Sequence, residues 1–341
     1  MRRYLKPTIV MAVLGLAFGA IYRYLFDPPE EAELANYLRS SLHGAGITLA
    51  AWAVQLYFTS RSSGWVRRWP LLVELVIRSA VMAVAVVAVT VAGEAVIYPY
   101  GVDHHWLVSD LPFILALTFP FSIVISTIYE LIRLVGGRVL VNFILGRYRR
   151  PVREQRVLLF LDLAGSTTLA EQMGELRVQD LLTRFFYDID EAIVAHGGEV
   201  HAYVGDEVIV SWPVSARPQR NSVDAFFAIE DRIAALAGLY RREFGLVPEF
   251  RAGIHAGPVV ISECGDSHRE VAYFGDTMNV AARLQAHCKE AGRRLLVSGE
   301  LVRLLPDATD FLVEPLGPTE LRGRAAPVEV FAVARCASAT A

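Results

Sequence analysis

Two aspartates stand where a divalent cation could be held. Asp162 closes an apolar run that begins at Val157, and Asp206 follows Gly205 in a short turn between two further apolar runs. Carboxylates at the ends of buried strands offer the hard oxygen ligands that Mg²⁺ and Mn²⁺ prefer, and the Leu163 carbonyl would add another. Cations shared by two carboxylates can activate a hydroxyl and hold a leaving pyrophosphate. Each motif also has a plainer interpretation, a helix cap for the first and ordinary turn chemistry for the second.

The residues after Asp162 are small and precede a helical pattern. They are Leu163, Ala164, Gly165, Ser166 and Thr167. Small residues at a helix start leave backbone N–H groups open to a ligand, and the N-terminal end of a helix favours negative charge. This segment therefore predicts a phosphate cradle beside the aspartates.

A third pair of residues falls on a predicted helix. Asn279 and Arg283 are spaced i,i+4, so their side chains share one helix face and can reach the same ligand. An asparagine can orient a ribose, and an arginine can neutralise charge that develops on a transferring phosphate. The alternative interpretation is a solvated helix face capped by Asp276.

The elements that must position these residues alternate between extended and helical patterns. Strands are expected at 156–163, 199–203, 207–212, 250–261, 271–274, 294–297, 311–316 and 328–334. Helices are expected at 166–173, 176–196, 219–243 and 276–290. The two runs around Gly205 and Asp206 predict a β-hairpin, and the whole pattern predicts an α+β domain with a mixed sheet. If the hairpin lies beside the first strand, Asp162 and Asp206 converge.

The first part of the chain has a different composition. Hydrophobic residues make up 54% of the 341 residues and are concentrated before residue 150. Four apolar stretches reach the roughly twenty residues that a membrane span needs. They are 7–26, 42–60, 71–93 and 111–134. Arginine and lysine flank them on one side and acidic residues on the other, so the positive-inside rule predicts a multi-pass protein of the plasma (inner) membrane with both termini in the cytoplasm.

These patterns predict a domain organisation in three parts. A transmembrane domain of four helices spans 1–135, a connector helix or linker spans 136–154, and a cytoplasmic domain spans 155–341. The connector is either a passive tether or a helix that transmits a change. Glu74 and Arg78 inside the third stretch either mark a sensing site for an unidentified ligand or simply pair with each other. The net charge of −3 gives no indication of nucleic-acid binding.

The three groups of residues together resemble the catalytic domain of class III nucleotidyl cyclases. The resemblance covers about 155–334 and rests on four motifs: Phe160-Leu-Asp-Leu-Ala-Gly-Ser-Thr167, Tyr203-Val-Gly-Asp206, Phe274-Gly-Asp-Thr-Met-Asn-Val-Ala-Ala-Arg283 and Leu321-Arg-Gly-Arg-Ala-Ala-Pro-Val-Glu-Val-Phe331. It implies a ferredoxin-like core with added strands that works as a head-to-tail homodimer. It also implies adenylyl cyclase activity, in which the ribose 3′-hydroxyl of ATP attacks the α-phosphorus and gives cyclic AMP and pyrophosphate.

The resemblance assigns a role to each of these residues. Asp162 and Asp206 of one protomer would hold two Mg²⁺ or Mn²⁺ ions in each active site. Asn279 would orient the ribose and Arg283 would stabilise the transition state, both supplied by the other protomer. Arg322 would contact the triphosphate.

The residues that read the purine in many family members are replaced in this chain. Ala202 stands where a lysine is usual, and Ala272 stands where its aspartate or threonine partner is usual. Neither side chain can hydrogen-bond a base, and His201, Tyr203 and Tyr273 are the neighbouring candidates. The glutamate–cysteine pair of guanylyl cyclases is not present either, so adenine is expected as the commoner substrate of the family. Two alternatives stay open, a cyclase of relaxed or guanine selectivity and a degenerate domain that binds nucleotide and only signals.

Overall fold

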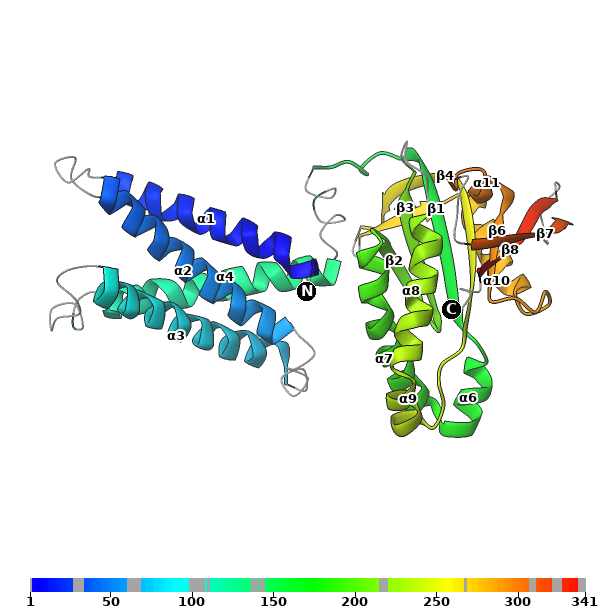
Figure 1. The fold of residues 1–341 in the computed structure, drawn as a ribbon, viewed down its shortest axis with the longest axis horizontal. Coiled ribbons are helices and arrows are strands. Elements are labelled where there is room, and N and C mark those ends of the chain that lie inside the picture. The colour runs from blue at the N-terminus through cyan, green and yellow to red at the C-terminus, as the bar shows by residue number, and fades with distance from the viewer. Residues whose placement is uncertain are drawn as a thin grey trace, which may run out of the picture. The chain divides into compact units, whose positions relative to one another are not determined.

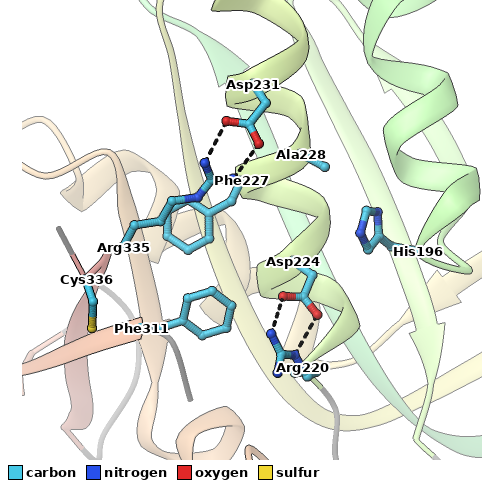
Figure 2. A pocket seen from close by; sticks show the side chains of 9 residues that line it. All are labelled: His196, Arg220, Asp224, Phe227, Ala228, Asp231, Phe311, Arg335 and Cys336. Atoms are coloured by element: carbon cyan, nitrogen blue, oxygen red, sulfur yellow. Dashed lines mark hydrogen bonds and ion pairs between the residues drawn. The ribbon is translucent and has the colours of Figure 1, made fainter. Parts of the chain in front are cut away.

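The chain divides into two compact units, Met1–Val141 and Asn142–Ala341. The computed structural model describes residues 2–26, 34–59, 69–97, 108, 111–135, 141, 145–214, 220–266, 269–306, 311–320 and 327–336. The first unit is helical and the second is built around one sheet (Figure 1). The division falls within the predicted connector.

The first unit holds four long helices among its described residues. They are α1 (Arg2–Phe26), α2 (Leu34–Thr59), α3 (Leu71–Ile97) and α4 (Leu111–Val135). Consecutive helices contact each other, and each predicted span falls largely within one helix. Two segments in the described part of the chain, Pro7–Leu25 and Leu71–Gly93, are long and apolar enough to cross a membrane. The number of spans therefore stays a prediction for the other two helices.

Glycines allow α1 and α2 to pack closely. A Cβ atom added at Gly15 would meet the carbonyl oxygen of Gly44, and one added at Gly19 would meet that of Ser40. Small residues spaced by four that bring helix backbones together are typical of helices packed within a membrane.

A buried charge links α3 to α4. The Arg78 side chain is fully buried, and its Nη2 lies 3.5 Å from a carboxylate oxygen of Glu74 and 3.5 Å from one of Glu130 on α4. The predicted pairing of Glu74 with Arg78 is therefore confirmed, and Glu130 is a second partner that local spacing does not reveal. Pairing lowers the cost of burying a charge, because an isolated one would be strongly unfavourable.

The second unit is built on a sheet of eight described strands. They are β1 (Val152–Leu163), β2 (Glu199–Val204), β3 (Glu207–Pro213), β4 (Phe250–Cys264), β5 (Glu270–Phe274), β6 (Leu295–Ser298), β7 (Phe311–Thr319) and β8 (Val328–Arg335). Their order is β2-β3-β1-β4-β6-β8-β7, and β5 pairs with β4. The β4–β6 pair is parallel and the others are antiparallel. The predicted α+β domain with a mixed sheet is confirmed.

Helices cover both faces of this sheet. They are α6 (Ser166–Met173), α7 (Glu175–Ala195), α8 (Asn221–Ala235), α9 (Ala237–Phe244), α10 (Asp276–His287) and α11 (Gly299–Val302). On one face α7 and α8 pack on Leu159 and Leu161 of β1 (Figure 1). On the other face α10 packs near Leu158 and Phe160. Burial on both faces explains why β1 is a continuous apolar run.

Several predicted boundaries were wrong, including the ends of β4, β7 and α10, and two of the differences have a physical cause. The helix expected over 219–243 is two helices, α8 and α9, that meet at Leu236. Tyr240 of α9 is fully buried, so tertiary packing decides this break. Strand β1 begins at Val152, before the predicted start, because residues 152–155 pair with 258–261 of the long strand β4. The polar side chains of residues 153–155 hide this extension from a hydropathy pattern.

Some predictions fall outside the described residues. Most of the connector between 136 and 144 lies there, as do the loops 27–33, 60–68 and 98–107 on which the membrane orientation depends. Arg322 lies there too.

Candidate active site

Strand pairing brings Asp162 and Asp206 together. β3 pairs with β1 so that Glu207 lies opposite Asp162, and Asp206 directly precedes Glu207 in the hairpin turn. Gly205 forms this turn with φ of 63°, a left-handed conformation that glycine adopts without steric cost. The Leu163 N–H donates to the Asp206 carbonyl at 3.3 Å, and the Asp206 carboxyl lies close enough to Asp162 to shift its pKa. The hairpin thus fixes both carboxyl groups at the end of β1.

The electrostatics at this point disfavour negative charge in the absence of a cation. Burial, the largest cause, and the neighbouring Asp206 carboxyl together raise the pKa of Asp162 to about 7. Burial, the largest cause, and the charges of Asp162 and Asp206 together raise the pKa of Glu207 to about 7. Sequence reasoning missed Glu207, although its place directly after the hairpin turn and opposite Asp162 could have signalled it.

The donor set fits a hard divalent cation. Two carboxylates and the Leu163 carbonyl are oxygen ligands of the kind that Mg²⁺ and Mn²⁺ take. In the described part of the chain, no group of three or more His, Cys, Asp or Glu side chains could hold a metal. A cation held by Asp162 and Asp206 would therefore need further oxygens, which substrate phosphates can supply.

We expect Mg²⁺ to bind more tightly at pH 8 than at pH 6, roughly tenfold or more, because protons compete for the carboxyl groups. The pKa of Asp162 is about 7 without metal, so this group is mostly protonated at pH 6 and mostly charged at pH 8. The measurement is a Mg²⁺ titration of the melting temperature of the full chain at both pH values. An Asp206→Asn variant is the control and should lose the shift. Equal midpoints at pH 6 and pH 8 would contradict the assignment.

The predicted phosphate cradle is only partly free to bind. The Leu163 N–H is bound to Asp206, and the Ala164 N–H donates to the Glu249 carbonyl at 2.8 Å. Gly165, with φ of 76°, turns the chain into α6, whose first hydrogen bond runs from the Leu169 N–H to the Gly165 carbonyl. The first-turn N–H groups at Ser166 and Thr167 have no acceptor within the helix, as at any helix start. Only the N–H groups at the start of α6 are therefore left to bind a phosphate among the residues predicted for the cradle.

Helix α10 carries the predicted Asn279 and Arg283. Asn279 is exposed, and Nη1 of Arg283 is buried with no hydrogen-bond partner among the described residues. Gln285 on the same helix donates from Nε2 to Oδ2 of Asp162 at 3.2 Å. At about 100° per residue, Arg283 lies some 160° around the helix from Gln285, whereas Asn279 and Arg283 are about 40° apart. The pair thus faces away from the carboxylates of its own chain.

Comparison with known proteins decides the family. Residues 151–334 match the adenylate and guanylate cyclase catalytic domain. The chain belongs to this family. This match covers the whole sheet unit from β1 to near the end of β8, so both aspartates and α10 fall within the cyclase domain.

Relatives of the cyclase chain include bacterial adenylate cyclases and mammalian guanylyl cyclases. It is 38% identical over 201 residues to adenylate cyclase 2 of Rhizobium meliloti (strain 1021), and the aligned region covers 59% of this chain and 55% of that protein. It is 32% identical over 191 residues to adenylate cyclase 1 of the same strain, which covers 54% and 28%. The chain thus spans about half the length, or less, of these curated relatives. A solved bacterial light-regulated adenylyl cyclase shares the fold, with TM-score 0.52 and 22% identity over 63% of this chain and 64% of that chain.

The cyclase domain carries an aromatic stack near the two alanines. A β-bulge interrupts the pairing of β2 with β3 between Val200 and Ala202, so His201 has no partner on β3. The His201 ring stacks on Tyr273 with centroids 4.0 Å apart, and the Tyr273 hydroxyl lies 3.3 Å from Ser211 Oγ. Regular strand alternation would place His201 and Ala202 on opposite faces, but Ala202 and Tyr273 belong to the same apolar cluster. The bulge therefore brings the imidazole beside Ala202.

Proposed function

We propose that this chain of the cyclase family is an adenylyl cyclase that converts ATP to 3′,5′-cyclic AMP and pyrophosphate. The observation that carries the proposal is the convergence of Asp162 and Asp206 at the end of β1, set by the pairing of β3 with β1. A structural ion pair would match each carboxylate with a cation, whereas this cluster gathers like charges. Two Rhizobium relatives named adenylate cyclase support adenine as the base.

The chemistry needs no covalent nucleophile from the protein. Mg²⁺ or Mn²⁺, two per site when bound by Asp162 and Asp206, would promote loss of the proton from the ribose 3′-hydroxyl and stabilise the leaving pyrophosphate. The start of α6 binds phosphate oxygens through N–H groups. Arg283 donates to the α-phosphate as charge develops there, and Asn279 orients the ribose. The 3′-oxygen–phosphorus bond forms, the bond to the pyrophosphate oxygen breaks, and the hydroxyl proton goes to solvent.

The active site is proposed to draw on two copies of the chain. Asn279 and Arg283 share a helix face that is turned away from Asp162 of the same chain, where Gln285 makes the contact. A head-to-tail homodimer can present this helix face, with the exposed Asn279 and the half-buried Arg283, to the active site that holds the carboxylates of the other copy. Arg322 is proposed as a further contact to the triphosphate.

The helical unit is proposed to anchor the enzyme in the plasma (inner) membrane through four helices. Large apolar side chains are exposed along α1 and α4, for example Phe18 at 65% and Val124 at 52%, and lipid would cover them. The close contact at Gly15 and Gly19 and the paired charge at Arg78 agree with helices packed in a bilayer. Retention in the membrane after carbonate extraction, with both termini reached only from the cytoplasmic side, tests this proposal.

The deciding experiment is turnover of the purified full chain with ATP and, separately, GTP. Each nucleotide is supplied with Mg²⁺ and with Mn²⁺, and the cyclic product is measured. We expect cyclic AMP from ATP, and we expect Asp206→Asn to abolish it. Cyclic GMP as the main product would establish the guanine-selective alternative. Nucleotide binding without any cyclic product would favour a degenerate signalling domain.

A further inference from the structure

We propose that Gln285 is a positioning residue that holds the Asp162 carboxylate ready for a cation. Its Nε2 donates to Oδ2 of Asp162 at 3.2 Å, and the two residues are 123 positions apart in the sequence. An amide N–H donated to a carboxylate stabilises the charged form and fixes the plane of the group. The hydrogen bond therefore opposes the effect of burial and of the neighbouring Asp206 on the same carboxyl group.

Gln285 is held in place by the packing of its helix. A Cβ atom added at Gly253 of β4 would meet the backbone nitrogen of Gln285, so α10 lies directly against this strand. Gly253 pairs with Phe160 of β1, two residues before Asp162. Leu284 and Cys288 on α10 are fully buried. A glutamine on a helix that is fixed this closely loses little additional freedom when it binds the carboxylate, which makes it suited to positioning.

The contact also gives α10 two functions. Its Gln285 touches the aspartate of its own chain, while Asn279 and Arg283 lie on another face of the same helix. In the proposed homodimer, this one rigid helix would join the metal carboxylates of one active site to the phosphate-binding arginine of the other. This inference rests on the proposed function only in the measurement of turnover, because the affinity for a cation can be measured whether or not the chain is a cyclase.

The test replaces Gln285 by methionine, which has a similar length and shape and keeps helix propensity but has no N–H donor. Two measurements on the full chain are compared with the wild type. The first is the Mn²⁺ affinity without nucleotide, from the loss of the free-ion electron paramagnetic resonance signal. The second is the Mg²⁺ concentration that gives half-maximal turnover at saturating ATP. We expect both to weaken by about 10- to 100-fold, with much of kcat recovered at high Mn²⁺, because loss of a residue that supports a metal ligand has this effect.

Two further variants make the result specific. Gln179→Met on the exposed surface of α7 is the matched control and should change neither quantity. Gln285→Leu also removes the donor and adds no charge, so it should weaken Mn²⁺ as much as methionine does. Unchanged Mn²⁺ affinity in both Gln285 variants would overturn the proposal, as would a loss of kcat that no Mn²⁺ concentration restores. Absence of product from the wild type would instead count against the proposed function, and the Mn²⁺ measurement would still decide the role of Gln285.

Discussion

Replacing Asp206 by asparagine is expected to lower kcat by roughly a thousandfold or more, because bound metal stabilises the transition state by several kcal/mol. The change keeps the size of the side chain in the hairpin turn and removes one of the two carboxylates that meet at the end of β1. Asp162→Asn should have the same effect. The measurement is cyclic AMP formation by purified full chain at saturating ATP and metal.

The melting temperature shows whether a loss of turnover comes from the missing carboxylate or from unfolding of the variant. The pKa of Asp162 is raised by burial from its ordinary value to about 7, so the charged form destabilises the metal-free fold above that pH. Asp162→Asn should therefore melt at the same or a higher temperature than the wild type at pH 8 without metal. Asp180→Asn on the exposed surface of α7 is the matched control and should leave both turnover and melting unchanged. An active Asp206→Asn enzyme would refute the assignment of the cation site.

Two inactive variants are expected to restore activity when they are combined. In a heterodimer of Asp162→Ala with Arg283→Ala, one active site receives both damaged parts and the other receives intact carboxylates with an intact arginine. Purified heterodimers, with one intact site of two, should then give about half of wild-type turnover. This follows because Arg283 faces away from the carboxylates that Gln285 of the same chain contacts. Co-expression with two affinity tags and tandem purification provides the measurement.

The pairing of Asp162→Ala with Asp206→Ala is the control for this recovery. Both changes damage the same half of the site, so every active site in their heterodimer lacks one carboxylate and no turnover should return. Recovery in this control would indicate exchange of strands or carry-over of wild-type protein. Isolated heterodimers of Asp162 and Arg283 variants with no activity would contradict a shared site.

Local sequence was sufficient for much of the fold and for the central residues. An apolar run ending in Asp162, the Gly205-Asp206 turn and the i,i+4 pair Asn279 and Arg283 are short-range signals, and each falls on the kind of element it predicted. The two-residue turn fixes the register of β2 and β3 and so places Asp206 at the tip of the hairpin. That Asp206 lies near Asp162 depends on the pairing of β3 with β1. Four helices also follow from the apolar stretches before residue 136.

Tertiary structure decided what depends on residues far apart in the chain. Glu207 joins the carboxylates because β3 pairs with β1, and Gln285 reaches Asp162 because Gly253 lets α10 lie against β4. The bulge at His201 reverses the face that strand alternation predicts. In the same way, the packing of α4 on α3 gives Arg78 its ion pair with Glu130. Sequence spacing specifies what lies on one helix face or one strand, whereas contacts between elements are set by packing that a periodic pattern does not contain.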